Sequence, residues 1–493
     1  MNSPFGRSSG MLIATLLAVM SLLTACASLP ALEGRSVSVA LADSSQTWLG
    51  LALAQGVAAH PGKTGIHTLV NPHDAFAARA VLAAAAEKSL DVQYYIWHAD
   101  QVGLLLFEAL WQAAERGVRV RLLLDDMNTS GLDPMIATLT AHPNMEVRLY
   151  NPIASRSSRA LNFLTDFTRL NHRMHNKSFT ADNQVSVVGG RNIGNEYFGV
   201  GKGVVFADLD VVAVGAAVRD VSSEFDLYWN SPSAYPAASL VGLPAADGVA
   251  SLKSRFSQTR ADPDSVDYID ATLTTPLDTT ARTDVLLFPA LMHTMGRAEK
   301  TFELISPYFV PGDEGTLALV GLARSGVKVR ILTNSLAASD ESAVHAGYAK
   351  HRHDLLTVGV QLYEMKPNAV AQAREKFRLG RSSSTGLHAK TFAVDRSRIF
   401  VGSFNMDQRS AKINTEMGLV IDSPALAQQL AAFFEDDVPM IAYEARLVPE
   451  GSKLEWTERT AAGAVRHGTE PEASWLLRAK VNLLSVLPID WLL

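Results

Sequence analysis

The chain has 493 residues, of which 47% are hydrophobic and 19% are charged, and its formal net charge is −6. This length exceeds one ordinary domain core, and the composition excludes an intrinsically disordered chain. Proteins that bind nucleic acid usually carry a basic excess, so the acidic balance argues against nucleic acid as a partner.

The N-terminal residues have the pattern of an export signal. Arg7 precedes an apolar run over 11–23, which is too short for a typical membrane-spanning helix, and Leu-Thr-Ala precedes Cys26. Cys26 is the only cysteine, so it cannot form an internal disulfide. Its surroundings resemble the lipobox of bacterial lipoproteins. This resemblance predicts a signal peptide over 1–25, a lipid on Cys26, and an anchor on the periplasmic side of an envelope membrane. An ordinary signal peptide and an uncleaved anchor are the alternatives.

Strand and helix patterns alternate after an N-terminal segment over 26–64. Strand-like runs flank a helical pattern that ends at Gly117, and the same alternation returns in the second half of the chain. The segment over 231–282 is rich in Pro, Ala, Ser and Asp, and we interpret it as a connection. The expected elements are a strand at 90–97, a helix at 103–116 and a strand at 118–124, followed by a strand at 302–309, a helix at 315–325 and a strand at 327–332.

Five short segments of the first half recur in the same order in the second half. For example, the tripeptide His175-Asn176-Lys177 recurs 213 residues later as His388-Ala389-Lys390. Two copies are too few for a solenoid, so the sequence predicts an α/β fold of two duplicated halves packed as a pseudo-dimer. We place the halves at 65–230 and 283–445, with a C-terminal tail over 446–493, and expect a monomer.

Each half carries the pattern His-x-Lys-x4-Asp, followed by two small residues and an Asn. Residues two apart in a strand point to the same face, so each His should project together with its Lys. If the halves pack about a two-fold axis, both pairs converge on one pocket. The candidate residues are His175, Lys177, Asp182 and Asn192 in the first half and His388, Lys390, Asp395 and Asn405 in the second half.

Such a pocket suits a phosphodiester. The lysines would stabilise the negative charge on the non-bridging oxygens. One neutral His would attack phosphorus and form a covalent intermediate. The other His would protonate the leaving alcohol and then take a proton from the incoming alcohol or water. Because the lysines supply positive charge, we expect neither a metal nor a cofactor.

A working His usually needs a partner that orients its other ring nitrogen. The repeat offers one carboxylate in each half, Asp208 and Glu416, each at the start of a strand-like run and about equally far beyond the His of its own half. We predict that these two residues support the histidines, with Asp210 as the alternative to Asp208. The competing interpretation is that they are surface acids at strand ends.

The duplicated pattern, in register and twice in one chain, resembles the phospholipase D superfamily. This resemblance implies two phospholipase D-like α/β/α sandwich halves and direct roles for the two His and two Lys, whereas Asp182 and Asp395 support the fold around the site. From about residue 65 to the C-terminus the sequence resembles the C-type bacterial cardiolipin synthases, on the segments 91–97, 122–126, 173–179, 188–194, 332–338, 345–348 and 487–493. Ala27 after Cys26 resembles an outer-membrane sorting signal, so inner and outer membrane both stay open.

Three segments are candidates for contact with a lipid surface. Two lie just before the motifs and mix basic with apolar residues, so they suit either an anionic lipid surface or a solvated loop. The third, 474–487, is too short to span a bilayer and suits either an interfacial helix or a packed C-terminal helix. The basic residues are Arg156, Arg159, Arg169 and Arg173 in the first segment and Arg374, Lys376, Arg378 and Arg381, around Phe377, in the second.

The leading functional hypothesis is a phosphatidyltransferase with phospholipid substrates, which makes cardiolipin from phosphatidylglycerol and a donor phospholipid through a phosphohistidine. The alternative is an envelope phospholipase D that uses water as acceptor, and exclusion of water would decide between them. A nuclease of the same superfamily fits poorly with the net charge of −6. A non-catalytic envelope scaffold fits poorly with the retention of all six motif residues.

Overall fold

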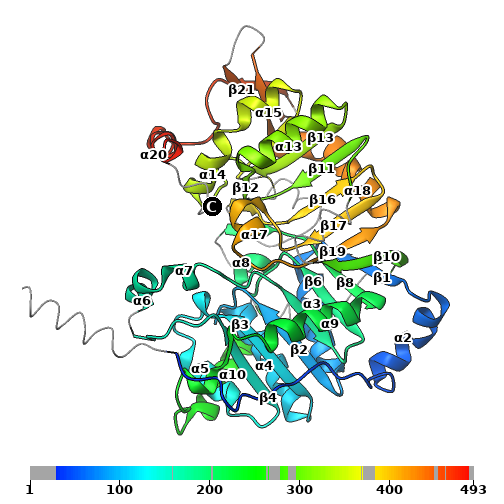
Figure 1. Cartoon of the computed structure of the whole chain (residues 1–493), viewed down its shortest axis with the longest axis vertical. Coiled ribbons are helices and arrows are strands. Elements are labelled where there is room, and N and C mark those ends of the chain that lie inside the picture. Colours follow the sequence, from blue (N-terminus) through cyan, green and yellow to red (C-terminus); the bar gives the residue numbers. More distant parts are fainter. Residues whose placement is uncertain are drawn as a thin grey trace, which may run out of the picture.

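A computed structural model describes residues 29–157, 159–200, 204–262, 265, 278–286, 296–367, 369, 384–448, 453–460 and 462–487. The expected signal peptide, Cys26, the basic segment around Phe377 and part of the connection lie outside the described residues. In Figure 1 the two halves are stacked along the long axis, with the first half below the second.

The first half is built on one mixed sheet. Its strands are β1 (Thr64–Leu69), β2 (Ser89–Tyr94), β3 (Arg119–Asp125), β4 (Met145–Tyr150), β5 (Ser178–Ala181), β6 (Val185–Gly189), β8 (Asp210–Gly215) and β9 (Ala234–Pro236). The strand order is β1-β8-β6-β5-β2-β3-β4-β9, in which β2, β3 and β4 are parallel to one another and the other pairings are antiparallel.

The second half repeats this order strand for strand. Its strands are β10 (Asp278–Leu286), β11 (Thr301–Ile305), β13 (Lys328–Asn334), β14 (Gln361–Met365), β16 (Thr391–Val394), β17 (Arg398–Gly402), β19 (Gly418–Asp422), β20 (Ala442–Leu447), β21 (Leu454–Thr460) and β22 (Gly463–His467). The order is β10-β19-β17-β16-β11-β13-β14-β20, and β21 and β22 extend the edge beyond β20.

Helices cover both faces of each sheet. In the first half α3 (Pro72–Ala85) and α4 (Gln101–Glu115) pack on one face, and α9 (Ala216–Trp229) packs on the other. In the second half α13 (Gly312–Arg324) and α15 (Arg352–Thr357) lie opposite α18 (Pro424–Asp436). This arrangement confirms the predicted fold class of two duplicated α/β/α sandwich halves.

The remaining helices and short strands lie in the connections and the tail. They are α2 (Trp48–Ala59), η1 (Asp126–Asn128), α5 (Asp133–Thr140), α6 (Arg159–Thr165), α7 (Phe167–Leu170), α8 (Asn195–Phe198), β7 (Val204–Ala207), η2 (Ala237–Ser239), α10 (Gly248–Ala261), β12 (Phe309–Val310), α14 (Ser342–Ala349), β15 (Ser384–Leu387), β18 (Met406–Asp407), α17 (Gln408–Lys412), α19 (Val438–Ile441) and α20 (Trp475–Ser485).

The two halves are joined by strand pairing and by a shared core. β1 pairs antiparallel with β10, which links the two sheets, and β7 of the first half pairs parallel with β15 of the second. One buried cluster combines Val188, Val211 and Ala213 of the first sheet with residues of the second half, such as Leu419 and Ile421. Because apolar surface from both halves leaves water together, the pseudo-dimer forms within one chain.

The strands β5 and β16 begin directly after the Lys of each motif and span 178–181 and 391–394. The two predicted strands 90–97 and 302–309 are too long. β2 ends at Tyr94, after which the backbone N–H of Ile96 donates to a side chain instead of the sheet. β11 ends at Ile305, just before Pro307, which has no N–H to donate to a sheet.

Candidate active site

The two motif loops lie at the seam between the halves, and each pairs with the other half. The backbone N–H of His175, which precedes β5, donates to the carbonyl of Thr415, which precedes β19. In the reciprocal contact, the N–H of His388 donates to the carbonyl of Ala207 at the end of β7. The backbone thus brings each His to the segment that carries the candidate carboxylate of the other half.

Each imidazole contacts a carboxylate across this seam. Nδ1 of His175 lies 2.8 Å from Oε2 of Glu416, and Nδ1 of His388 lies 2.5 Å from Oδ2 of Asp208. The sequence offers one carboxylate in each half, and in the structure each His contacts the carboxylate of the other half. Asp210, the alternative, instead pairs with Arg79 and is buried beside it, 2.8 Å away.

Both lysines are buried beside their histidines. Nζ of Lys177 donates to the carbonyl of His175, and Nζ of Lys390 donates to the carbonyl of His388, each over 2.5 Å. The charge of Lys390 also lowers the pKa of His175, and that of Lys177 lowers the pKa of His388. The four side chains therefore share one electrostatic environment, as the two-fold arrangement predicts.

Burial and neighbouring charge keep both imidazoles neutral at neutral pH. Burial, followed by the charges of the two lysines, holds the pKa of His175 well below its usual range, and burial followed by the charge of Lys390 lowers the pKa of His388 to about 4. Burial also lowers the pKa of Lys177 to about 7 and that of Lys390 to about 8. A buried phosphate anion would offset these shifts, so the cluster is suited to a negatively charged ligand.

The two carboxylates differ in their own proton affinity. Burial raises the pKa of Glu416 to about 7. Burial also opposes ionisation of Asp208, but the interaction and hydrogen bond with His388, together with the charges of Lys390 and Arg191, outweigh it and bring the pKa of Asp208 below its usual range. Asp208 is therefore ionised at neutral pH, whereas Glu416 titrates there.

The two motif aspartates lie at the far end of the motif strands. Asp182 follows β5 and accepts from the backbone N–H groups of 87, 88 and 89, and Asp395 follows β16 and accepts from those of 299, 300 and 301. A four-residue strand spans roughly 13 Å, which separates each aspartate from the histidine of its motif. The structure therefore brings together four of the six motif residues and places these two in support of the sheet.

The small residues after each motif either leave space for a carboxylate or donate a hydrogen bond to it. A Cβ at Gly190 would lie 2.2 Å from Oδ1 of Asp208, so this glycine leaves the space that the carboxylate occupies. The corresponding Ser403 donates its hydroxyl to Oε2 of Glu416 over 2.5 Å. Asn192 accepts from the N–H of Ile96, and Oδ1 of the buried Asn405 has no hydrogen-bond partner among the described residues.

Sequence reasoning missed the aromatic side chains around the imidazoles. The ring of Tyr95 lies 5.0 Å from that of His175, and the rings of Tyr197 and Phe206 lie 5.1 and 5.3 Å from that of His388. Tyr95 directly follows β2, where the carboxyl ends of the parallel strands meet, and this position was a usable signal. Tyr197 and Phe206 lie on α8 and β7, outside the five recurring segments, so the repeat gave no signal for them.

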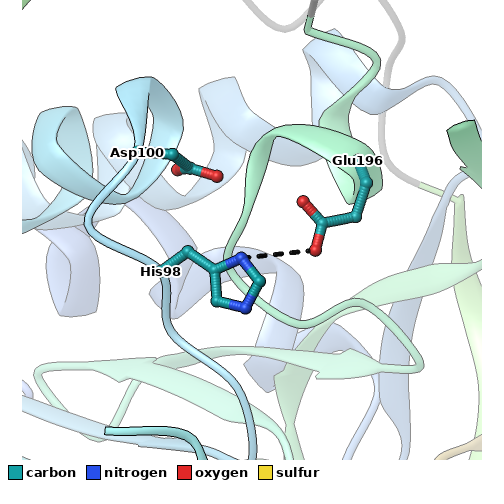
Figure 2. A group of neighbouring side chains, drawn as sticks. All are labelled: His98, Asp100 and Glu196. Carbon is teal, nitrogen blue, oxygen red and sulfur yellow. Dashed lines mark ion pairs between the residues drawn. The ribbon is translucent and has the colours of Figure 1, made fainter. Parts of the chain in front are cut away.

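One group of side chains outside this cluster has donor atoms of the kind that ligate metals. Figure 2 shows His98, Asp100 and Glu196, whose ligand atoms lie within 4.8 Å of one another, with His98 Nδ1 3.4 Å from Oε1 of Glu196. Both oxygens of Asp100 already accept backbone N–H groups, from Gly103 at the start of α4 and from Asn195. These contacts account for Asp100 as a helix cap, and we assign no metal to the group.

The arginines of the first basic segment are engaged inside the protein. Arg156 pairs with Asp126 and Asp133, Arg159 contacts the same acids, and Arg169 pairs with Asp166. Arg173 is buried, with a guanidinium nitrogen 3.2 Å from Asp125. Both alternatives for Arg173, a lipid-contacting rim and a solvated loop, are therefore wrong, and the charges of the other three arginines are largely compensated by acids. Among the described residues, no helix is both long and apolar enough to cross a bilayer.

Two α/β halves that share a seam with two His-x-Lys pairs define a phospholipase D-like protein. A family model described as "Cardiolipin synthase, PLD-like domain" matches residues 81–229 and again residues 291–438. The chain belongs to this family, as the resemblance of its motifs predicts, and is thus an enzyme of the phosphatidyltransferase type.

Individual relatives agree with this assignment. The chain is 44% identical to cardiolipin synthase C of Escherichia coli over 462 residues, which cover 88% of this chain and 97% of that protein. It is 26% identical to cardiolipin synthase 1 of Bacillus anthracis, over 82% of this chain and 73% of that protein. The crystal structure of phosphatidylserine synthase from Haemophilus influenzae matches with a TM-score of 0.55 at 14% identity, covers 87% of this chain and 95% of that one, and shows the fold.

Proposed function

We propose that the protein transfers a phosphatidyl group from a donor phospholipid to a histidine and then to the free hydroxyl of phosphatidylglycerol. The products are cardiolipin and the released alcohol of the donor, such as glycerol or ethanolamine. The observation that carries the proposal is the pair of imidazole–carboxylate contacts across the seam, His175 with Glu416 and His388 with Asp208, beside two buried lysines.

The proposed reaction has two displacements at phosphorus. One neutral imidazole attacks, a P–N bond forms, and the P–O bond to the donor alcohol breaks. The other imidazole, protonated when the anionic diester raises its pKa, gives its proton to the leaving oxygen. It then takes the proton of the acceptor hydroxyl, whose oxygen displaces the histidine and regenerates the enzyme. Lys177 and Lys390 stabilise the charge on the non-bridging oxygens.

The carboxylates orient the rings in this scheme. A carboxylate on Nδ1 leaves Nε2 of each imidazole for the substrate and stabilises the ring when it gains positive charge. Because each carboxylate comes from the opposite half, neither half contains a complete His–carboxylate pair. We therefore propose that a single chain holds the whole site and works as a monomer, with halves at 65–230 and 283–445 that enclose the matched segments 81–229 and 291–438.

We further propose that the protein is a lipoprotein anchored through Cys26 to an envelope membrane, with its catalytic halves on the periplasmic side. The lipobox-like sequence before Cys26 supports this location. Incorporation of labelled fatty acid in cells should be abolished by Cys26→Ser. Incorporation that is unaffected by this substitution would contradict the proposal.

Mass spectrometry of lipids made by purified enzyme tests the reaction. His175→Ala and His388→Ala should each lower cardiolipin formation by roughly 1,000-fold or more, because the nucleophile and the acid–base group are both required. The matched control is His353→Ala, since the side chain of His353 is 50% exposed and lies on α15. Full activity in either active-site variant would break the two-histidine mechanism. Phosphatidic acid as the main wild-type product would show that water, and not phosphatidylglycerol, is the acceptor.

A further inference from the structure

Helix α20 near the C-terminus packs on the protein with one face only. Leu477, Val481 and Leu484 contact a small cluster that includes Leu336 and Ala346, on the side of α14. The sequence left a packed helix and an interfacial helix as alternatives for this segment. The contacts establish the packed face, and they leave the opposite face of the helix without a partner among the described residues.

That opposite face is apolar and exposed. At 100° per residue its members fall within an arc of roughly 120°, which is the width of the apolar stripe on a surface helix. We call this surface the outer face of α20. It consists of Trp475 (69% exposed), Leu476 (61%), Leu483 (68%), Val486 (76%) and Leu487 (42%), the last two just beyond the helix end.

The helix is connected to the candidate active site through the end of β13. The side chain of Asn334 holds both the N–H and the carbonyl of Leu387, the residue before His388, over 2.8 and 3.1 Å. Two residues further along the chain, Leu336 is buried against α20. In Figure 1, α20 projects at the edge of the second half beside α14. The packed face of α20 is thus linked through Leu336 and Asn334 to the residue before the second motif, and the outer face points away from this contact.

Basic side chains border the outer face. Lys480 lies on α20 next to the apolar arc, with Nζ 3.2 Å from the hydroxyl of Ser342, and Nζ of Lys350 lies 3.2 Å from the carbonyl of Leu487. Tryptophan with leucine and valine on one face and lysines at its margin is the chemistry of a helix that lies in the plane of an anionic bilayer. An eleven-residue helix spans only about 16 Å, too short to cross a bilayer.

We propose that the outer face of α20 docks the enzyme on an anionic phospholipid bilayer and so presents the second motif to its substrate. The choice of a bilayer as the occupant rests on the proposed function. Trp475 and Leu483 enter the boundary between headgroups and acyl chains, and Lys480 and Lys350 remain at the level of the phosphates. This contact acts in addition to any anchor at the N-terminus, because it fixes the orientation of the seam relative to the lipid.

A single-cysteine label tests the contact directly. Since Cys26 is the only cysteine, Cys26→Ser makes a full-length chain to which one label site can be added. An environment-sensitive fluorophore on Leu483→Cys should shift to the blue with phosphatidylglycerol–phosphatidylcholine vesicles and be quenched by spin-labelled lipid. The matched control is Leu243→Cys, because Leu243 is 94% exposed and distant in sequence, and its label should stay in water. A label at 483 that stays in water would overturn the proposal, as would a blue shift without vesicles that grows with protein concentration, which would indicate a second copy.

Kinetics separate docking from catalysis. For Leu483→Glu, the ratio of turnover on vesicles to turnover on monomeric short-chain phospholipid should fall at least tenfold, whereas Leu243→Glu should leave this ratio unchanged. An equal loss on both substrates would indicate a merely structural role for Leu483 and overturn the proposal. If the wild type transfers no phosphatidyl group from either substrate but the label at 483 still enters the bilayer, the proposed function fails and the docking surface stands.

Discussion

The two half-sites of the seam have the same plan and different proton affinities. In one, His388 contacts Asp208, and Gly190 leaves room for the carboxylate. In the other, His175 contacts Glu416, which also accepts the hydroxyl of Ser403. Duplication therefore conserved the contact between imidazole and carboxylate, while the side chains around it diverged.

We interpret this difference in pKa as a separation of acid and base roles between the two half-sites. Asp208 has a lowered pKa and holds a permanent negative charge beside His388, which favours a ring that accepts protons. Glu416, whose pKa is raised to about 7 by burial, is only partly ionised beside His175 at neutral pH. Two carboxyl groups whose surroundings separate their pKa values are typical of sites in which two groups have distinct acid and base roles. The predictions below test how far the half-sites are equivalent.

Of the substitutions compared below, those of the two lysines should lower transfer most, and the loss should be similar in the two half-sites. Lys177→Met and Lys390→Met each remove a buried charge from the proposed phosphate site, so we expect transfer to fall by roughly 1,000-fold in each. Because burial lowers both lysine pKa values, folding works against these charges at any pH below the unfolded pKa of about 10.5, and their removal should raise the free energy of unfolding at pH 7. Initial rates and urea unfolding check both statements.

The matched control for the lysines is Lys328→Met, since Lys328 is exposed on β13. Its transfer rate should equal that of the wild type. If either Lys177→Met or Lys390→Met retained activity within tenfold of the wild type, the two half-sites would not be equivalent in binding the phosphate.

The carboxylates should give smaller effects that differ between the half-sites. At pH 6, Asp208→Asn should lower transfer by roughly 100-fold and Glu416→Gln by roughly tenfold, because at this pH Asp208 is ionised and Glu416 is mostly protonated. The effects on stability should have opposite signs. Stability from the lowered pKa of Asp208 is present above its unfolded pKa and is lost only as pH falls through the folded value, so Asp208→Asn destabilises at pH 7.

For Glu416 the effect of substitution on the free energy of unfolding has the opposite sign. Its pKa is raised from 4.5 to about 7, so its contribution to stability is present below pH 4.5 and is lost as pH rises through 7. Glu416→Gln should therefore increase the free energy of unfolding more at pH 8 than at pH 5, as measured by urea titration at the two values. A destabilisation by Glu416→Gln at pH 8 would contradict the assignment of a raised pKa.

Substitutions at Gly190 and Ser403, which follow the two motifs, should lower transfer less than those of the lysines and of Asp208. Gly190→Ala places a Cβ where Oδ1 of Asp208 lies, so the carboxylate must move and transfer should fall roughly tenfold. Ser403→Ala removes a hydrogen bond that lowers the pKa of Glu416. We expect only a few-fold loss at pH 8, together with a shift of the acidic limb of the pH–rate profile to higher pH. An acidic limb that stays in place would exclude Glu416 as its origin.

Local sequence patterns predicted the fold and the cluster of four motif side chains because both depend on short-range periodicity and on repetition. The alternation of strands and helices, the spacing of His and Lys, and the alignment of Asp208 with Glu416 can all be read along one half of the chain. The exchange of carboxylates between halves could not be read in this way. Each carboxylate follows the His of its own half at nearly the same distance, so only the packing of the halves decides the pairing.

The basic segment before His175 shows a second limit of the sequence. Arg173 among apolar neighbours has the same pattern whether it faces anionic lipid or a buried acid, and the acid that pairs with it, Asp125, lies 48 residues earlier at the end of β3. The converse holds for α20, whose amphipathic pattern was compatible with packing and with a lipid interface, and whose exposed apolar face appears only in three dimensions. Long-range pairing of charges and the exposure of a helix face are properties of the assembled fold.

The motif aspartates should give the smallest effect on chemistry, and here too the halves differ. Asp182 is fully buried, whereas Asp395 accepts N–H groups that are mostly exposed. Asn tolerates the left-handed backbone at both positions, where φ is 49° and 52°, but it turns an NH₂ group toward backbone N–H donors. Asp182→Asn should therefore cost about 2–3 kcal/mol of stability and Asp395→Asn less, with transfer per folded molecule unchanged.

Thermal unfolding against pH distinguishes this role in folding from a role in the reaction. Burial opposes ionisation of Asp395, but hydrogen bonds from the N–H groups of 299, 300 and 301 hold its pKa below its usual range. Its contribution is thus present above the unfolded pKa and is lost as pH falls through the folded value, so the cost of Asp395→Asn should shrink in acid. A large loss of transfer in a fully folded Asp182→Asn or Asp395→Asn would instead mean that the substituted aspartate takes part in the reaction.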